Sequence, residues 1–305
     1  MVEIDSKRLK KEIVLAADIG GSHITVAPVD LSSAKVMNEH IVRMRVDSKG
    51  TKEEILSTWC KALEEVCDSL SDRPCKLALA MPGPFDYEKG IAYIKGLDKY
   101  ENLYATNIRN EFVIRLAFLP DQVLFRNDAE AFLHGEIATG LVETQKKVLG
   151  LTLGTGFGAA LSYMGETKDL NLGGEIYKTS IADDFFTTRW FVGRYRVSSN
   201  QQINGVESLI SLVGKDEAVD LIFEEYAYAL ADFLAPHIVK HNVDSVVFGG
   251  NISKGQRYFL PQLQEILSHQ GITPDINLAR QGEQSAIIGA AFLFGGNGNK
   301  SYKKE

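Results

Sequence analysis

The chain has few cysteines and no long apolar run, and each absence excludes a class of protein. Three of its 305 residues are cysteine, an odd number without the spacing of a zinc site or a disulfide framework. Cys60 and Cys67 fall on one helical pattern, so we expect core thiols in a reducing cytoplasm. No stretch of about 18 apolar residues is present, and we therefore expect no membrane contact.

The chain also lacks an excess of positive charge. Lys and Arg total 33 against 40 Asp and Glu, a net charge of −7, which argues against nucleic acid as a partner. The polar N-terminal residues lack the apolar core of a signal peptide, which together with the cysteine usage predicts a cytoplasmic protein. The short basic tail at residues 300–304 is expected to be disordered. The length favours two domains.

A strand, a glycine turn and a second strand near the N-terminus form the first pattern with chemical content. Apolar residues 13–17 lead into Asp18, a Gly-Gly-Ser turn follows at 20–22, and residues 24–29 are again apolar. Adjacent glycines let the backbone approach a ligand and direct its N–H groups at it, while Asp18 can hold a cation directly or through water. An ordinary hairpin with a solvated aspartate fits the same pattern, because short glycine motifs recur by chance.

The same layout recurs in the second half of the chain. Residues 148–153 read as a strand, Gly-Thr-Gly at 154–156 as the turn, and residues 157–161 as the returning strand. Neither turn is a Walker A loop, and a strand rather than a helix follows, so the dinucleotide pattern is excluded as well. Two phosphate-type hairpins, one in each half, indicate a duplicated domain that closes on a nucleotide from both sides.

Polar residues follow several other strands. Asn127 and Asp128 stand between a strand at 123–125 and a helix at 128–139, where helix capping explains them as readily as a polar pair facing a cleft. Glu175 follows a Gly-Gly loop, and Glu207 could be an ordinary surface carboxylate in a first helical turn.

Apolar periodicity predicts the remaining elements that matter here. They are a helix over 51–69 with Thr51 as N-cap and Glu54 three residues on, helices over 102–116, 182–192 and 282–291, the last with small residues for close packing, two helical segments over 215–239, and a strand over 243–248 that ends in a Gly-Gly-Asn turn.

In this order, the motifs resemble those of the ROK family of sugar kinases and sugar-responsive repressors, within the actin/hexokinase/Hsp70-like ATPase superfamily. The resemblance implies an α/β fold with two actin-like ATPase (ribonuclease H-like) domains, mixed sheets flanked by helices, and an interdomain cleft. It places the N-terminal domain at residues 1–125, completed by a C-terminal helix at 290–305, and the C-terminal domain at 126–289.

The resemblance implies an ATP-dependent kinase that phosphorylates a hexose at its 6-hydroxyl with Mg²⁺, glucose being the default sugar, and a homodimer. A sugar-responsive transcriptional regulator and a non-catalytic sugar-binding protein are the alternatives. About a dozen residues precede the first strand, which we expect to be too few for a helix-turn-helix domain, and the presence of Asp128 argues against a silent protein.

The resemblance also assigns roles to residues. Asp128 matches the general base, and Asn127, Glu175 and, through the segment at 205–208, Glu207 match sugar-binding residues. The nucleotide-binding set that it implies is Asp18 (the Mg²⁺ anchor), Gly20, Gly21, Ser22, Gly154, Thr155, Gly156, Gly249, Gly250 and Asn251.

Two departures from the family pattern matter. The stretch 182–206, which matches the family's zinc-binding cysteine cluster, contains no cysteine, so we expect no zinc site. Lys178 replaces the expected histidine of the sugar site and Tyr177 replaces a glycine, which leaves open whether they supply the missing contact. His23 stands where many relatives have Lys or Thr; it reads as a polar strand residue, with a phosphate contact as the alternative.

Overall fold

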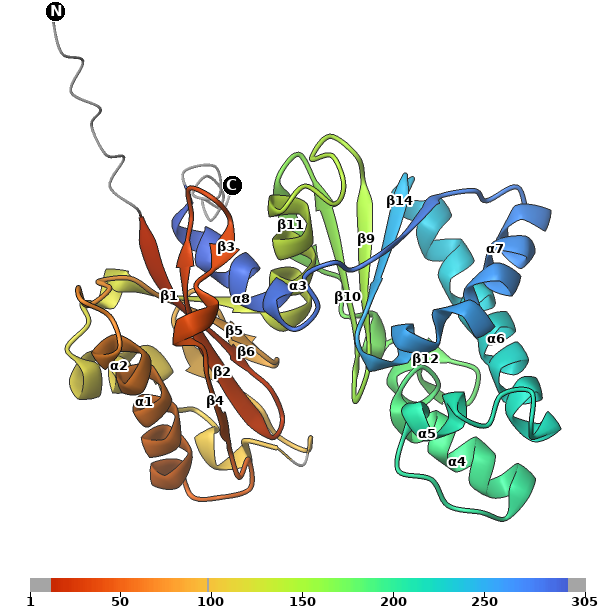
Figure 1. The fold of residues 1–305 in the computed structure, drawn as a ribbon, viewed down its shortest axis with the longest axis horizontal. Coiled ribbons are helices and arrows are strands. Elements are labelled where there is room, and N and C mark those ends of the chain that lie inside the picture. The colour runs from red at the N-terminus through yellow and green to blue at the C-terminus, as the bar shows by residue number, and fades with distance from the viewer. Residues whose placement is uncertain (1–11, 98, 296–305) are drawn as a thin grey trace, which may run out of the picture. The chain divides into compact units, whose positions relative to one another are not determined.

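The structure, a computed structural model, describes residues 12–97 and 99–295, and its internal contacts divide the chain into two compact units (Figure 1). Unit 1 comprises Met1–Asn127 with Ala290–Glu305, and unit 2 comprises Asp128–Gly289. The basic tail at 300–304 lies outside the described residues. Within the described part of the chain, no helix has the length and apolar character needed to cross a membrane.

Unit 1 is built on a mixed sheet with the strand order β3-β2-β1-β5-β8, and β4 also pairs with β2. The first two strands form the expected antiparallel hairpin, whereas β5 and β8 continue the sheet in parallel. The elements are β1 (Ile13–Ile19), β2 (His23–Asp30), β3 (Lys35–Val36), η1 (Asn38–His40), β4 (Val42–Arg45), α1 (Lys52–Asp68), β5 (Leu77–Met81), β6 (Phe85–Asp86), β7 (Ile91–Ala92), η2 (Glu101–Leu103), α2 (Ile108–Leu116), η3 (Pro120–Gln122), β8 (Val123–Asn127) and η7 (Phe292–Phe294).

The core of unit 1 lies between one face of this sheet and helices α1 and α2. Alternate residues of β1, namely Leu15, Ala17 and Ile19, enter this core, because successive side chains of a strand point to opposite faces. Helix α1 begins as predicted: the Thr51 hydroxyl accepts the Glu54 N–H, and the Glu54 carboxylate accepts the Thr51 N–H at 2.8 Å. Asp18 therefore lies on the sheet face opposite the α1 core.

Unit 2 repeats the arrangement of unit 1 with the strand order β11-β10-β9-β14-β15. An antiparallel hairpin is again extended by parallel strands. The elements are α3 (Asp128–Ala138), β9 (Val148–Leu153), β10 (Phe157–Tyr163), β11 (Glu166–Asp169), η4 (Leu172–Gly174), β12 (Ile176–Tyr177), β13 (Ser180–Ile181), η5 (Ala182–Asp184), α4 (Thr188–Ser199), α5 (Val206–Ile210), α6 (Glu217–His241), β14 (Ser245–Gly249), η6 (Asn251–Tyr258), α7 (Leu260–His269), β15 (Asp275–Leu278) and α8 (Gln284–Ala291), whose last two residues belong to unit 1.

The two faces of the unit 2 sheet carry different layers. Helices α6 and α7 lie on one side of the sheet and α3 on the other (Figure 1). Leu149, Leu151 and Leu153 of β9 pack with α6 and α7, whereas Val148 packs with α3.

The small residues of α8 permit close packing, as expected. A methyl group at Gly135 of α3 would overlap the Ser285 carbonyl of α8, so only glycine fits at this helix contact.

Three predicted helices differ in their boundaries. The helix expected over 102–116 begins only at Ile108, because Tyr100 and Ala105 have positive φ and residues 101–103 form a separate 3₁₀ turn. The helix expected over 182–192 runs from Thr188 to Ser199 after a 3₁₀ turn at 182–184. The two segments expected over 215–239 are one helix, α6, which tolerates Pro236 because its apolar face is buried along its whole length.

Candidate active site

The first glycine turn leaves two consecutive N–H groups available. The Gly20 N–H donates to the His23 carbonyl at 2.9 Å, and the Tyr100 hydroxyl donates to the Gly20 carbonyl at 2.5 Å. The next two N–H groups, of Gly21 and Ser22, have no hydrogen-bond partner among the described residues. Consecutive free N–H groups in a turn form an anion-binding concavity. The ring of His23 lies 2.9 Å from the Ser22 hydroxyl, so this histidine supports the turn.

Asp18 lies in a row of side chains that crosses the unit 1 sheet. Its register partner on one side is Thr25, whose own partner is Arg43. On the other side Asp18 faces Ala80, and Ala80 faces Arg126. Partners in register point to the same face, so an aspartate and two arginines share this face. Such a row combines a cation ligand with positive charge suited to phosphate oxygens.

The second glycine turn is held more firmly than the first. The Gly154 N–H donates to the Gly156 carbonyl at 3.1 Å, and the Thr188 N–H donates to the Gly154 carbonyl at 2.8 Å. The Phe157 N–H donates to Asp183 Oδ1 at 2.7 Å. Among the described residues, the N–H groups of Thr155 and Gly156 have no partner, so this turn presents the same kind of donor pair as the first.

Asp183 supports the second glycine turn and was not singled out from the sequence. One carboxylate oxygen holds the second turn, and the other lies 2.8 Å from the Arg189 guanidinium. The segment of Asp183 is also joined to the Glu175 loop, because the Ala182 N–H donates to the Glu175 carbonyl at 2.8 Å. The only sequence signal was an acidic pair, 183–184, which reads as an ordinary surface feature.

Asn127 and Asp128 stand where β8 ends and α3 begins, as the sequence predicted. Asn127 is buried, and its side-chain amide donates to the Tyr87 hydroxyl at 3.2 Å; that hydroxyl donates to the Met81 carbonyl. Asp128 is exposed, with Oδ1 accepting the Ala129 N–H at 3.0 Å. Tyr87 was not singled out from the sequence. It fixes the Asn127 amide, and Asp128 follows directly at the exposed start of α3.

The Glu175 loop packs against the second glycine turn. The Glu175 N–H closes the 3₁₀ turn η4 by donating to the Leu172 carbonyl, and a side chain at Gly173 would meet the Phe157 carbonyl. The Glu175 carboxylate is about half exposed and lies 3.3 Å from Nε2 of His237 on α6. The structure therefore brings Glu175 and the predicted phosphate turn together within unit 2.

Glu207 has a different neighbourhood. Its carboxylate forms a 2.7 Å ion pair with Lys254 of η6, and this lysine lowers the pKa of Glu207. Helix η6 follows the Gly249-Gly250 turn directly, so the structure links Glu207 to the predicted nucleotide-binding turn at 249–251. Among the described residues, the Glu207 carboxylate contacts Lys254 and not Glu175.

The turn that follows β14 admits no side chains. Gly250 has a φ of +87°, and a Cβ there would overlap the Leu153 carbonyl at the end of β9. A Cβ at Gly249 would overlap the Phe132 ring. Because β14 runs parallel to β9, the two turns lie at the same edge of the sheet. The carboxyl ends of parallel strands are where α/β folds bind ligands.

The side chains of Tyr177 and Lys178 have partners outside the predicted sugar-binding set. The Tyr177 hydroxyl donates to Asp232 at 3.0 Å, and the Lys178 ammonium lies 5.0 Å from the Tyr177 ring centroid. Among the described residues, no group of three or more His, Cys, Asp or Glu side chains could hold a metal, and the prediction that zinc is absent awaits a measurement. The stretch 182–206, which matches the family's cysteine cluster, contributes Phe185, Phe186, Trp190 and Phe191 to a network of ring contacts. The other rings of this network are Phe157, Tyr177, Phe223, Tyr226, Phe233, Tyr258 and Phe259.

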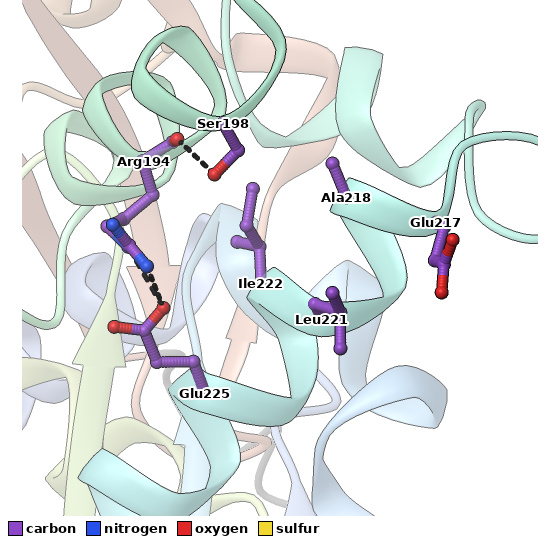
Figure 2. Close-up of a pocket in the computed structure, with 7 residues that line it drawn as sticks. All are labelled: Arg194, Ser198, Glu217, Ala218, Leu221, Ile222 and Glu225. Atoms are coloured by element: carbon purple, nitrogen blue, oxygen red, sulfur yellow. Dashed lines mark hydrogen bonds and ion pairs between the residues drawn. The ribbon is translucent and has the colours of Figure 1, made fainter.

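A pocket between α4 and α6 is lined by none of the predicted site residues. Figure 2 shows Arg194 of α4 reaching Glu225 of α6, and Nη2 lies 2.6 Å from the carboxylate. Ser198, Glu217, Ala218, Leu221 and Ile222 complete its lining. The pocket has no glycine turn, and its one arginine is paired with Glu225, so we do not assign the chemistry to it.

Comparison with known proteins gives one consistent family. The sequence model described as ROK family matches residues 14–168 and 194–296, leaving out the segment that contains Glu175 and Asp183. An N-acetyl-D-glucosamine kinase from Mannheimia succiniciproducens is 25% identical over 91% of this chain and 97% of its own length. Among solved structures, a ROK family glucokinase from Streptomyces griseus has a TM-score of 0.75 at 16% identity, over 92% of this chain and 98% of its own. A glucokinase from Parabacteroides distasonis has a TM-score of 0.76 at 20% identity, over 94% and 98%. These likenesses confirm the predicted two-part α/β fold.

Proposed function

The chain belongs to the ROK family, and from this premise we propose that it is an ATP-dependent sugar kinase that phosphorylates the 6-hydroxyl of a hexose. The observation that carries the proposal is the pair of glycine turns, each with two consecutive N–H groups that lack partners among the described residues. Phosphoryl transfer requires positioning and charge stabilisation more than covalent chemistry, and backbone N–H groups in such turns are suited to phosphate oxygens.

We propose N-acetylglucosamine ahead of glucose as the sugar to be phosphorylated. Glucose was the default from the motifs alone. The relative from Mannheimia succiniciproducens, which is 25% identical over 97% of its own length, is named an N-acetyl-D-glucosamine kinase. The glucokinases are similar at 20% identity or less, a level that supports the fold rather than the substrate.

Each site residue has a role that its surroundings support. Asp128, exposed and held by the Ala129 N–H, would accept the proton of the attacking hydroxyl, a contribution of roughly 10²–10⁴ in rate. Asn127, fixed by Tyr87, and Glu175 would bind sugar hydroxyls. The turns at 20–22 and 154–156 would bind the phosphates, and the turn at 249–251 would bind the adenosine side.

Mg²⁺ fits the donor set of unit 1. Asp18 would hold it directly or through water, and the metal would neutralise charge on the phosphates. Arg43 and Arg126, in the same row as Asp18, would contact phosphate oxygens rather than the metal.

A kinase assay across a sugar panel tests this proposal. The protein is incubated with ATP, Mg²⁺ and N-acetylglucosamine, glucose, mannose or fructose, and ADP and the sugar phosphate are measured. We expect sugar-dependent ADP production with N-acetylglucosamine and a 6-phosphate product. Sugar binding without ADP production would favour the non-catalytic alternative, and neither binding nor turnover with any sugar would overturn the proposal.

A further inference from the structure

His237 is a buried histidine whose polar side-chain contact is Glu175. It lies on α6 with its ring centroid 5.0 Å from that of Phe233, and Nε2 is 3.3 Å from Glu175 Oε2. No other polar partner of the His237 ring occurs among the described residues. The contact joins two elements that are far apart in the sequence, η4 with its following loop and the C-terminal half of α6.

The groups around His237 act on its pKa in opposite directions. Burial lowers the pKa of His237, Glu175 raises it, and Lys240 and His241 of the same helix lower it further. A neutral imidazole carries its proton on one nitrogen, and Nε2 is the nitrogen that lies beside Glu175. The contact uses one carboxylate oxygen of Glu175 and leaves the other for a ligand.

Glu175 is a side chain that needs such a support. It follows two glycines, and its carboxylate is 47% exposed, so neither the backbone nor packing restricts it strongly. A glutamate in this position has several rotatable bonds, and fixing them costs conformational entropy when a ligand binds. Lys178, at the place of the expected histidine, lies over the Tyr177 ring instead.

We propose that His237 is a positioning residue for the sugar site, holding the Glu175 carboxylate in the orientation that accepts sugar hydroxyls. The residue beside the Glu175 carboxylate thus comes from helix α6, whereas Lys178 of the following loop contacts the Tyr177 ring. The inference rests on the proposed function, because it takes Glu175 as a sugar-binding residue. It predicts that loss of His237 weakens sugar binding selectively and leaves ATP binding unchanged.

Steady-state kinetics of three variants test the positioning role. In His237→Ala we expect the KM for the sugar to rise about 10-fold, because the Glu175 carboxylate loses its polar neighbour, with the KM for ATP within about twofold of wild type. His237→Gln, which retains an N–H donor, should recover most of the sugar affinity. His269→Ala on α7 is the matched control, since that histidine is exposed, and should behave as wild type.

A second measurement tests the contact without relying on catalysis. The six histidines can be followed by NMR titration of ring-labelled protein. We expect Glu175→Gln to lower the pKa of His237 further, because the carboxylate that raises it is gone, and to leave His269 unchanged.

Unchanged sugar KM in an active His237→Ala enzyme would overturn the inference. A second outcome would also overturn it: the KM values for sugar and ATP both rise in His237→Ala, its melting temperature falls, and His237→Gln does not recover sugar affinity. That pattern is the one expected of a purely structural residue. A wild-type protein without kinase activity would overturn the proposed function instead, and the NMR titration would still decide whether the two side chains are coupled.

Discussion

The carboxylate of Glu136 on α3 accepts a 2.5 Å hydrogen bond from the Ser285 hydroxyl at the start of α8. Glu136 is fully buried and also accepts the N–H groups of Arg280 and Gln281, each at 2.9 Å. A side chain of α3 therefore satisfies two N–H groups of the loop that leads into α8 and a hydroxyl in the first turn of that helix. A buried carboxylate with three donors fixes the loop and the helix start against α3.

Replacing this carboxylate should destabilise unit 2. Glu136→Gln keeps the size but places an amide N–H₂ against donors, so we expect a loss of about 2–3 kcal/mol in the free energy of unfolding. Urea denaturation followed by circular dichroism measures it. Glu143→Gln, at an exposed position, is the control and should change stability by less than about 0.5 kcal/mol. Equal stability of the two variants would contradict this role of Glu136.

Replacing Asp128 should separate chemistry from folding. Asp128→Asn retains the acceptor for the Ala129 N–H and removes the proton acceptor, so we expect kcat to fall by about 10² or more while sugar binding persists. Single-turnover kinetics and calorimetric sugar titration give the two quantities. Asp121→Asn, exposed in η3, is the matched control. Near wild-type turnover by Asp128→Asn would exclude it as the base.

Local sequence patterns predicted much of the fold. The two hairpins and the cap of α1 depend on neighbouring residues, as in the reciprocal bonds of Thr51 and Glu54, and the structure shows them as expected. The helix expected over 182–192 was misplaced because the aromatic residues on both sides of the true start at Thr188 enter one core. The apolar pattern of these residues continues from the 3₁₀ turn at 182–184 into α4, so the sequence does not mark where the helix begins.

The supporting residues of the site could not be found in the same way. Asp183 matters because it accepts the Phe157 N–H, and His237 because it lies beside Glu175. Both contacts join segments that only the tertiary fold brings together, and neither residue stands in a motif. Tyr87, which holds Asn127, is missed for the same reason. The sequence thus indicates residues on the glycine turns and strand ends better than the residues that hold them.

The aromatic core should make zinc unnecessary. Tyr177 packs in it at 5.4 Å from Phe233, and its hydroxyl is satisfied by Asp232, so the region has both apolar burial and a buried hydrogen bond. We expect elemental analysis to find no stoichiometric zinc and EDTA to leave the melting temperature unchanged in buffer without Mg²⁺. Tyr177→Phe should lower stability by about 1 kcal/mol, because Asp232 loses a donor. A tightly held zinc would contradict the prediction.

The three cysteines should differ sharply in reactivity. Burial raises the pKa of Cys60 to about 11 and also raises that of Cys67, whereas Cys75 is exposed. The thiolate is the reactive form, so at pH 8 we expect a thiol reagent to modify Cys75 rapidly and the other two only on unfolding. Mass spectrometry of the native and urea-denatured protein measures this, with Cys75→Ser as the control. Rapid modification of native Cys60 would show that the α1 core opens readily.

A side chain in the second glycine turn should weaken ATP binding without unfolding the protein. A Cβ at Gly156 would lie 3.5 Å from Asp183 Oδ1, an ordinary contact, so the fold can accept Gly156→Val. The valine would occupy the space in front of the free N–H groups of the turn, where a phosphate must approach closely. We expect the KM for ATP to rise at least about 10-fold and the sugar affinity to change by less than about twofold. Gly193→Ala on α4, where a Cβ has open space, is the matched control. If Gly156→Val folds and its KM for ATP equals that of the control, the second turn is not a phosphate-binding loop.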